Sequence, residues 1–247
     1  MEADGRPQKK PTSPWVYVGC GCGVLVVLGL LAFGGMTWWV FRAGKEMEQT
    51  MNDPVKREAK VRSVLHYDQL PAGYYPAFAM TAPMGFMEMA MLTDRDPGTG
   101  KAAPGQEFDQ RGFMYMNMAQ MKDNKEKMAR FLRGEAPRPE DSGWSQSTVK
   151  FDPKEVVRRG SVTVNGTEVL YSAGRGDIDR HHGRERAHGL VTMVMPMCPH
   201  DPRLRFAMWY GPDPAPDKPV AEADYSGTNA DPAAIQEFLG HFWLCGK

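Results

Sequence analysis

The sequence predicts an α+β domain, in which helices pack on one face of an antiparallel sheet, behind an N-terminal membrane anchor. Short apolar runs separated by turn residues fill much of the second half of the chain, which is typical of antiparallel strands. Only a middle and a final segment of the domain have helical character. The chain of 247 residues also has 20 prolines and 26 glycines, which indicate many turns rather than a helical bundle.

The anchor is predicted by an apolar run from Val16 to Phe41 that contains no charged residue. As a helix this run would be about 39 Å long, enough to cross a hydrocarbon core of about 30 Å. Aromatic residues flank it, as in the belts at membrane interfaces: Trp15, Tyr17, Trp38 and Trp39. A cleaved signal peptide is the alternative, with Ala32-Phe33-Gly34 as its cleavage site, but the apolar run continues past that site.

These features divide the chain into four parts. The segment before the anchor is rich in proline and lysine and should be disordered. The length that follows the anchor suits one domain. We expect a disordered basic tail over residues 1–14, a transmembrane helix over 15–41, a helical stalk over 42–66 and a globular domain over 67–247.

Helix and strand signals alternate in the next part of the chain. Asp53-Pro54 is an N-cap followed by proline at the first helical position, so a helix should run over 54–65. The proline-rich and glycine-rich segment 70–76 then breaks the helix. After it we expect strands over 78–81, 85–93 and 108–119 and a helix over 122–133.

Asn165-Gly166 is the strongest hairpin signal in the chain, because these residues readily adopt the positive φ angles of a type I′ turn. This turn joins the first two of four strands, expected over 162–164, 167–173, 189–197 and 204–210. Asp231-Pro232 repeats the cap signal and begins a final helix that ends near His241.

Two cysteines, Cys198 and Cys245, lie in the domain, whereas Cys20 and Cys22 lie in the apolar run. An even pair with one member close to the end of the sequence predicts a disulfide that ties the tail to the domain. That bond would place the domain outside the cytoplasm, in the periplasm. Two unrelated buried thiols are the alternative. Lysines and arginines after the anchor favour the opposite, inward orientation.

Gly19 and Gly23 open the apolar run at a G-x-x-x-G spacing. Small residues four apart let two spanning helices approach closely, so this spacing predicts self-association of the anchor and a homo-oligomer. Glycine is also common in spanning helices that do not associate, and the pattern supports this alternative about equally.

Half of the 18 methionines fall in three alternating triplets: Met87-Met89-Met91, Met114-Met116-Met118 and Met193-Met195-Met197. A period of two places each triplet on one face of its strand. We expect these methionines to line the buried face of the sheet where it meets its helices, because their unbranched side chains fill irregular gaps. A flexible groove for a lipid or an apolar peptide is a further alternative.

A copper-type metal site is another use of the same residues. Met195, Met197, Cys198 and His200 offer thioether, thiol and imidazole groups within six residues, and thioethers favour Cu(I). Neighbouring methionines of one strand are about 7 Å apart, however, which is too far to share an ion without cross-strand partners. We therefore favour packing over metal binding and expect no cofactor.

The segment 177–188 is the most polar stretch in the second half of the chain. Its carboxylates and imidazoles are candidate zinc ligands: Asp177, Asp179, His181, His182 and His188. Their spacing matches no common ligand pattern and the intervening arginines would repel a cation, so we favour an exposed hairpin loop. An enzyme would gather His181, His182 and one of the aspartates in a cleft.

The balanced charge and the motifs that the sequence lacks argue against nucleic-acid binding and against several common classes of enzyme. The 30 basic and 30 acidic residues balance, so no net field attracts nucleic acid. The sequence has no P-loop, dinucleotide-binding fingerprint, H-E-x-x-H or G-x-S-x-G motif. We expect a non-enzymatic, single-pass membrane protein whose domain contacts another envelope component or has a structural role there, and whose anchor forms a homo-oligomer through Gly19 and Gly23. A periplasmic copper-binding or copper-sensing protein is the alternative.

Overall fold

The computed structural model describes residues 42, 44–45, 49–50, 52–82, 85–98, 110–119, 122–137, 150–180 and 185–246. The chain divides into two compact units, Met1–Glu48 and Gln49–Lys247. The expected basic tail over 1–14 and the expected transmembrane helix over 15–41, with Gly19 and Gly23, lie outside the described residues. Among the residues that are described, no helix is both long enough and apolar enough to cross a membrane.

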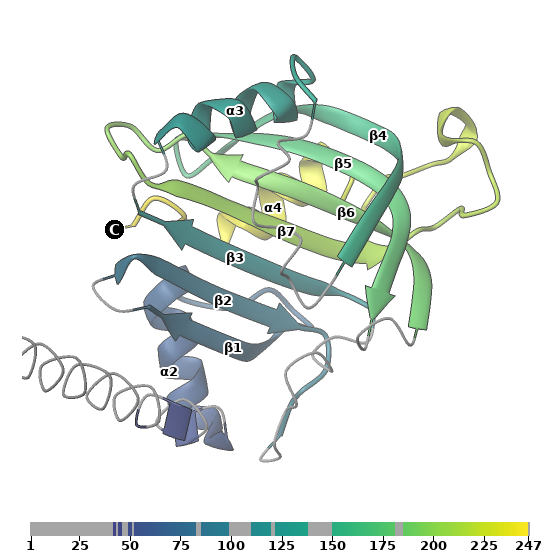
Figure 1. The fold of residues 1–247 in the computed structure, drawn as a ribbon. Coiled ribbons are helices and arrows are strands. Elements are labelled where there is room, and N and C mark those ends of the chain that lie inside the picture. The colour runs from purple at the N-terminus through teal and green to yellow at the C-terminus, as the bar shows by residue number, and fades with distance from the viewer. Residues whose placement is uncertain are drawn as a thin grey trace, which may run out of the picture. The chain divides into compact units, whose positions relative to one another are not determined.

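The second unit is an α+β domain, as the sequence predicts. Its described strands form one open antiparallel sheet of seven strands in the order β1-β2-β3-β7-β6-β5-β4 (Figure 1). The strands are β1 (Tyr75–Thr81), β2 (Met87–Thr93), β3 (Gly112–Met118), β4 (Lys150–Val164), β5 (Thr167–Arg180), β6 (Glu185–Pro196) and β7 (Leu204–Pro212). The helices are α2 (Pro54–Leu65), α3 (Lys122–Arg133) and α4 (Pro232–Gly240), with a short 3₁₀ turn, η4 (Val220–Glu222).

Two antiparallel meanders make up this sheet. Strands β1, β2 and β3 follow one another, as do β4, β5, β6 and β7, and the ladder between β3 and β7 joins the two sets. The expected hairpin lies between β4 and β5, where Asn165 and Gly166 have φ angles of 49° and 77°. Both angles are in the left-handed region that a type I′ turn requires, which confirms the turn predicted from Asn-Gly.

Helix α2 has the predicted bounds and the predicted cap, since the Asp53 side chain accepts hydrogen bonds from the first turn of the helix. It does not form a stalk, however. Val61, Val64 and Leu65 are buried, and the helix packs against β1 and β2. The domain therefore includes residues 54–65, which the sequence alone assigned to a stalk over 42–66, because these apolar side chains need a surface that covers them.

The helices lie on both faces of the sheet, not on one face as expected. Helices α2 and α4 lie behind the sheet in Figure 1 and share one core cluster, whereas α3 lies in front of it and belongs to a second cluster. The physical reason is that both faces of the sheet are apolar, one lined with aromatic residues and the other with methionine. Each face therefore buries apolar area only when an element covers it.

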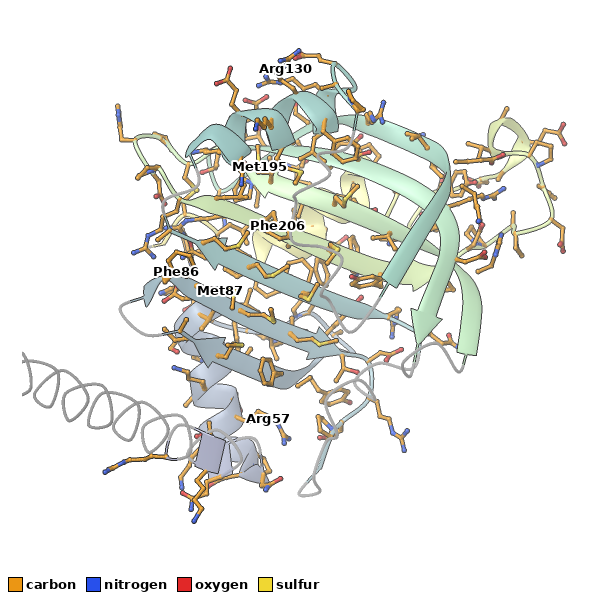
Figure 2. The ribbon with its side chains drawn as sticks, viewed as in Figure 1. Arg57, Phe86, Met87, Arg130, Met195 and Phe206 are labelled. Carbon is orange, nitrogen blue, oxygen red and sulfur yellow. A yellow bond between two sulfur atoms is a disulfide. The ribbon has the colours of Figure 1, made fainter. Side chains whose placement is uncertain are left out.

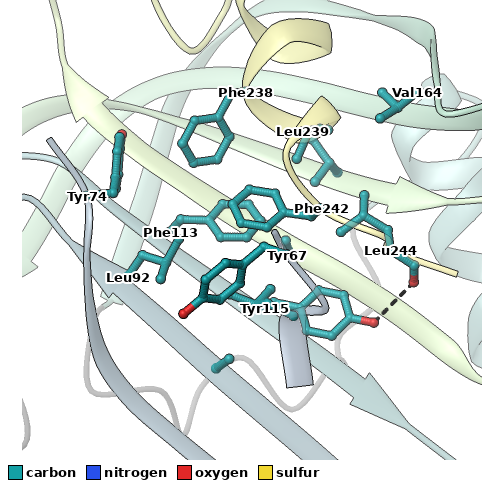
Figure 3. Close-up of a cluster of buried hydrophobic side chains, with 14 of the residues drawn as sticks. Tyr67, Tyr74, Leu92, Phe113, Tyr115, Val164, Phe238, Leu239, Phe242 and Leu244 are labelled. Carbon is teal, nitrogen blue, oxygen red and sulfur yellow. Dashed lines mark hydrogen bonds between the residues drawn. The ribbon is translucent and has the colours of Figure 1, made fainter. Parts of the chain in front are cut away.

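On the face of the sheet that α4 covers, aromatic residues make up much of the core. Phe113 of β3 stacks on Phe242 with ring centroids 5.3 Å apart, and Trp209 of β7 stacks on Phe238 of α4 at 4.1 Å. The indole of Trp209 also donates a hydrogen bond to the hydroxyl of Tyr74 at 2.7 Å. Figure 3 shows the rings of Tyr74, Phe113, Phe238 and Phe242 in this cluster. The final helix and the tail are therefore held by stacked rings as well as by aliphatic contacts.

Strand β4 is longer than the sequence indicates. It begins at Lys150, whereas we expected only residues 162–164, and its partner β5 continues to Arg180 instead of ending at 173. Strand β4 is the edge of the sheet, and its side chains from Lys154 to Ser161 are mostly exposed. Such a strand lacks the apolar alternation on which a prediction depends, and an edge also tolerates a proline such as Pro153.

Candidate functional site

The most distinctive surface of the domain is the face of the sheet that carries α3, which we call the methionine face. Its methionines come from five strands: Met80, Met87, Met89, Met91, Met114, Met116, Met118, Met193, Met195 and Met208. The first two triplets lie wholly on this face, whereas the third contributes Met193 and Met195, because Met197 follows the end of β6. Figure 2 shows Met87, Phe206 and Met195 on this face.

The strand register brings methionines from different strands opposite one another. Met89 of β2 pairs with Met80 of β1 on one side and with Met116 of β3 on the other. A second row runs through Met91, Met114, Met208 and Met193. Directly opposite residues have Cβ atoms about 4.5–5.5 Å apart, so the thioethers within each row are neighbours.

Helix α3 covers only one part of the methionine face. Its apolar side chains, which include Met128 and Leu132, belong to the same cluster as Met195 and Phe206. Met195 is 0% exposed and Met208 is 3% exposed, so core packing accounts for the methionines of this part. Toward β1 and β2 the face is more open, and Met80, Met87 and Met89 are only half-buried.

The four residues of the alternative copper-type site have different surroundings in the structure. The sulfur of Cys198 is bonded to Cys245, so it offers no thiolate, and Met195 is fully buried. His200 is exposed in a turn with a φ angle of 58°. Met197 follows β6 and is half-buried. Six consecutive residues thus point into different surroundings, because the strand ends at Pro196 and a turn follows.

A polar cluster surrounds the disulfide. The backbone carbonyl of Leu244 accepts hydrogen bonds from Arg205 Nη1 at 2.8 Å and from the Tyr115 hydroxyl at 3.3 Å. Arg205 also contacts Asp201 Oδ2 through Nε at 2.8 Å and through Nη2 at 2.7 Å. The tail therefore docks on the sheet through one covalent bond and a charge-assisted network.

Burial and neighbouring charges shift the pKa values of Tyr115 and Asp201 in this cluster. Burial raises the pKa of Tyr115 to about 12, with a smaller opposing effect of the Arg205 guanidinium. For Asp201, burial favours the neutral acid, but the backbone N–H of Arg203 and the guanidinium of Arg205 together lower the pKa of its carboxyl. At neutral pH the cluster thus holds a neutral phenol beside an ion pair.

A cavity of about 170 Å³ lies between the β4–β5 turn and the tail. It is lined by Val164, Asn165, Thr167, Val169, Pro196, Phe242, Trp243, Leu244, Cys245 and Gly246. Small-molecule sites usually enclose about 300–1,000 Å³, so this space is small for a metabolite.

The polar segment 177–188 belongs to the β5–β6 hairpin, and its tip lies outside the described residues, including His181 and His182. At its base, His188 Nδ1 lies 2.7 Å from Asp177 Oδ1, and Lys154 lies 3.8 Å from the other oxygen of Asp177. In the described part of the chain, no three residues among histidine, cysteine, aspartate and glutamate are grouped to hold a metal ion.

Sequence reasoning missed a buried ion pair between β5 and the loop that follows β7. Arg175 of β5 places Nε 2.8 Å from Asp213 Oδ2, and both side chains are almost fully buried. Arg175 also donates hydrogen bonds to the carbonyls of Ala215 and Lys218 and lies over the ring of Tyr225. These contacts fasten the proline-rich loop after β7. An arginine within an apolar strand was the available signal, since a buried charge requires a partner.

Comparison with models of protein families, with curated proteins and with solved structures finds no match to this chain.

Proposed function

We propose that this protein is a single-pass, membrane-anchored protein of the envelope, whose α+β domain lies outside the cytoplasm and contacts another envelope component without catalysing a reaction. The observation that carries the proposal is the disulfide between Cys198 and Cys245. Disulfides form and persist in oxidising spaces and are rare in the cytosol. The apolar run Val16–Phe41 supports the anchor through its length and its lack of charge.

The surroundings of the cysteines support the bond as a structural one. Their Cα atoms are 5.5 Å apart, which is the usual separation for a disulfide. The residue before Cys245 is tied independently to the sheet, because its carbonyl accepts two hydrogen bonds. The two thiols would thus meet by folding alone, and an oxidising compartment would join them.

The test is the redox state of Cys198 and Cys245 in membranes of the native host. Free thiols are blocked with an alkylating reagent before lysis, and peptides are then compared by mass spectrometry with and without reductant. A linked pair supports the extracytoplasmic domain. Two thiols that are both alkylated before reduction would overturn it and favour the inward orientation.

The anchor and its self-association have their own test. The full chain should remain in the membrane fraction after alkaline carbonate extraction, whereas a variant without residues 15–41 should be released. Chemical cross-linking in membranes should give a dimer that Gly19→Leu and Gly23→Leu weaken, because leucine separates the helix backbones. Release of the full chain would contradict the anchor, and unchanged cross-linking would contradict the role of these glycines.

A further inference from the structure

We propose that Met80, Met89 and Met116 form a binding site for Cu(I) across three adjacent strands, with Met87 and Met118 as flanking donors. This inference concerns a different surface from the disulfide and does not depend on the membrane anchor. It also differs from the set of Met195, Met197, Cys198 and His200, which the fold separates.

The register provides the cross-strand partners that a methionine site requires. Met80 pairs with Met89, and Met89 pairs with Met116, so the three residues form one row across β1, β2 and β3. Met87 and Met118 form the adjacent pair on the same face. The thioether side chain has three rotatable bonds, which allows the sulfurs of the two outer residues to lean toward the central one.

The donors and their neighbours favour a soft, monovalent ion. Thioethers are neutral ligands that select Cu(I), whereas carboxylates and carbonyl oxygens suit harder ions. The strand neighbours of Met116 and Met118 on β7 are Phe206 and Leu204, which are apolar. The nearest carboxylate along β2 is that of Glu88, which points to the other face and accepts a hydrogen bond from Asn117 at 2.7 Å.

The row is more exposed than the buried methionines of the core, although Met89 and Met116 also pack against that core. Met91, Met114, Met193, Met195 and Met208 are all less than a tenth exposed, and burial accounts for them. The side chains of the row are half-buried, so solvent reaches them and they gain less from burial. Exposed Phe86, directly before the start of β2, lies beside Met87 in Figure 2. The row is thus accessible to an ion.

The experiment measures Cu(I) affinity of the full chain in detergent, under anaerobic conditions with ascorbate, by competition with a coloured Cu(I) chelator. All proteins carry Cys20→Ser and Cys22→Ser, so that thiolates of the N-terminal segment do not compete. The test variant is Met89→Leu with Met116→Leu, which keeps side-chain volume. The matched control is Met193→Leu with Met208→Leu, because these residues also form a cross-strand pair on this face but are buried.

We expect the parent and the control variant to bind one Cu(I), and the test variant to lose at least tenfold in affinity. X-ray absorption of the loaded parent should show a coordination shell of sulfur alone. Failure of the parent to retain Cu(I), an equal loss in both variants, or a shell of nitrogen and oxygen would each overturn the site. Far-UV circular dichroism verifies that the variants fold, and Met80→Leu on β1 gives a second, single-site test.

Discussion

Gly166 shows how a single backbone angle specifies part of this fold. Its φ angle is 77°, and a Cβ atom added there would meet no atom within 4 Å. Any cost of a side chain at this position therefore comes from the backbone and not from a clash. Gly240 at the end of α4 is equally open, but its φ angle is not in the left-handed region.

This contrast predicts opposite effects of the same substitution. Gly166→Ala should lower the free energy of unfolding by about 1–2 kcal/mol, because alanine is strained in the left-handed region. Gly240→Ala should leave it unchanged or raise it by about 0.4–1 kcal/mol, because alanine restricts the unfolded chain. Urea unfolding of the two variants measures both effects. Equal effects would contradict the role of the turn.

The raised pKa of Tyr115 predicts that the free energy of unfolding falls at high pH. Burial raises its pKa from 10 to about 12 in the folded state. The folded protein thus keeps the phenol proton at a pH where the unfolded chain has lost it, so this contribution to stability is complete below pH 10 and is lost as the pH rises toward 12. The slope should be at most about 1.4 kcal/mol per pH unit.

Tyr115→Phe tests this assignment. The variant should remove part of the decline in unfolding free energy between pH 10 and 12, as measured by urea unfolding at several pH values. At pH 7 it should cost only about 0.5–1.5 kcal/mol, because the Leu244 carbonyl still accepts a hydrogen bond from Arg205. An unchanged slope would show that Tyr115 titrates without linkage to folding.

Residue-level features were predictable from the sequence where the cause is local. Asp53 and Asp231 accept hydrogen bonds from the first turns of α2 and α4, as their position before proline indicates. The Asn165-Gly166 turn is also encoded within a few residues. The pair of Arg175 and Asp213 was not predictable, because its partners meet only after β5, β6 and β7 have formed one sheet.

At the scale of elements, the disulfide should stabilise the link between the tail and the sheet. Cys198 and Cys245 are separated by 47 residues, so the bond restricts a long loop of the unfolded chain. Reduction should lower the free energy of unfolding by about 2–4 kcal/mol. Urea unfolding with and without reductant measures this. A variant with Cys198→Ala and Cys245→Ala is the control, and its stability should not respond to reductant.

Helix bounds were easier to predict than helix placement. The bounds of α2 and α3 match the predicted ranges 54–65 and 122–133, because caps and apolar spacing lie within each helix. The face on which α3 packs was not predictable. A stripe with Met128 and Leu132 identifies the buried side of the helix but not the side of the sheet that receives it.

We expect the whole domain to depend on α2 for its stability. Val61, Val64 and Leu65 are each at most 4% exposed, and burial of one such side chain contributes about 1.5–3 kcal/mol. The burial of all three side chains contributes a free energy comparable to the total free energy of unfolding of a domain, about 5–15 kcal/mol. A fragment that begins at Gln49 should therefore unfold cooperatively, whereas one that begins at Tyr67 should not. Thermal unfolding followed by near-UV circular dichroism distinguishes the two fragments. Cooperative unfolding of the fragment that begins at Tyr67 would show that the domain folds without α2, as expected for a stalk.

The methionine site illustrates what the sequence could and could not predict at this scale. The spacing of the triplets indicated a shared face, because side chains alternate along any strand. It did not indicate which strands would be neighbours. Met80 lies outside the triplets, and only the register of β1 with β2 places it beside Met89. Long-range pairing of this kind leaves no local signal.

The ladder between β3 and β7 has a consequence for the order of folding. It pairs Gly112 with Tyr210 and Met118 with Leu204, so closing it requires ordering of a long intervening chain. Contacts between such distant residues form slowly, whereas neighbouring hairpins form early. Strands β1, β2 and β3 are consecutive, and the row of Met80, Met89 and Met116 lies wholly within them. The three methionines thus belong to a single meander, and their pairing does not require the ladder that joins the two meanders.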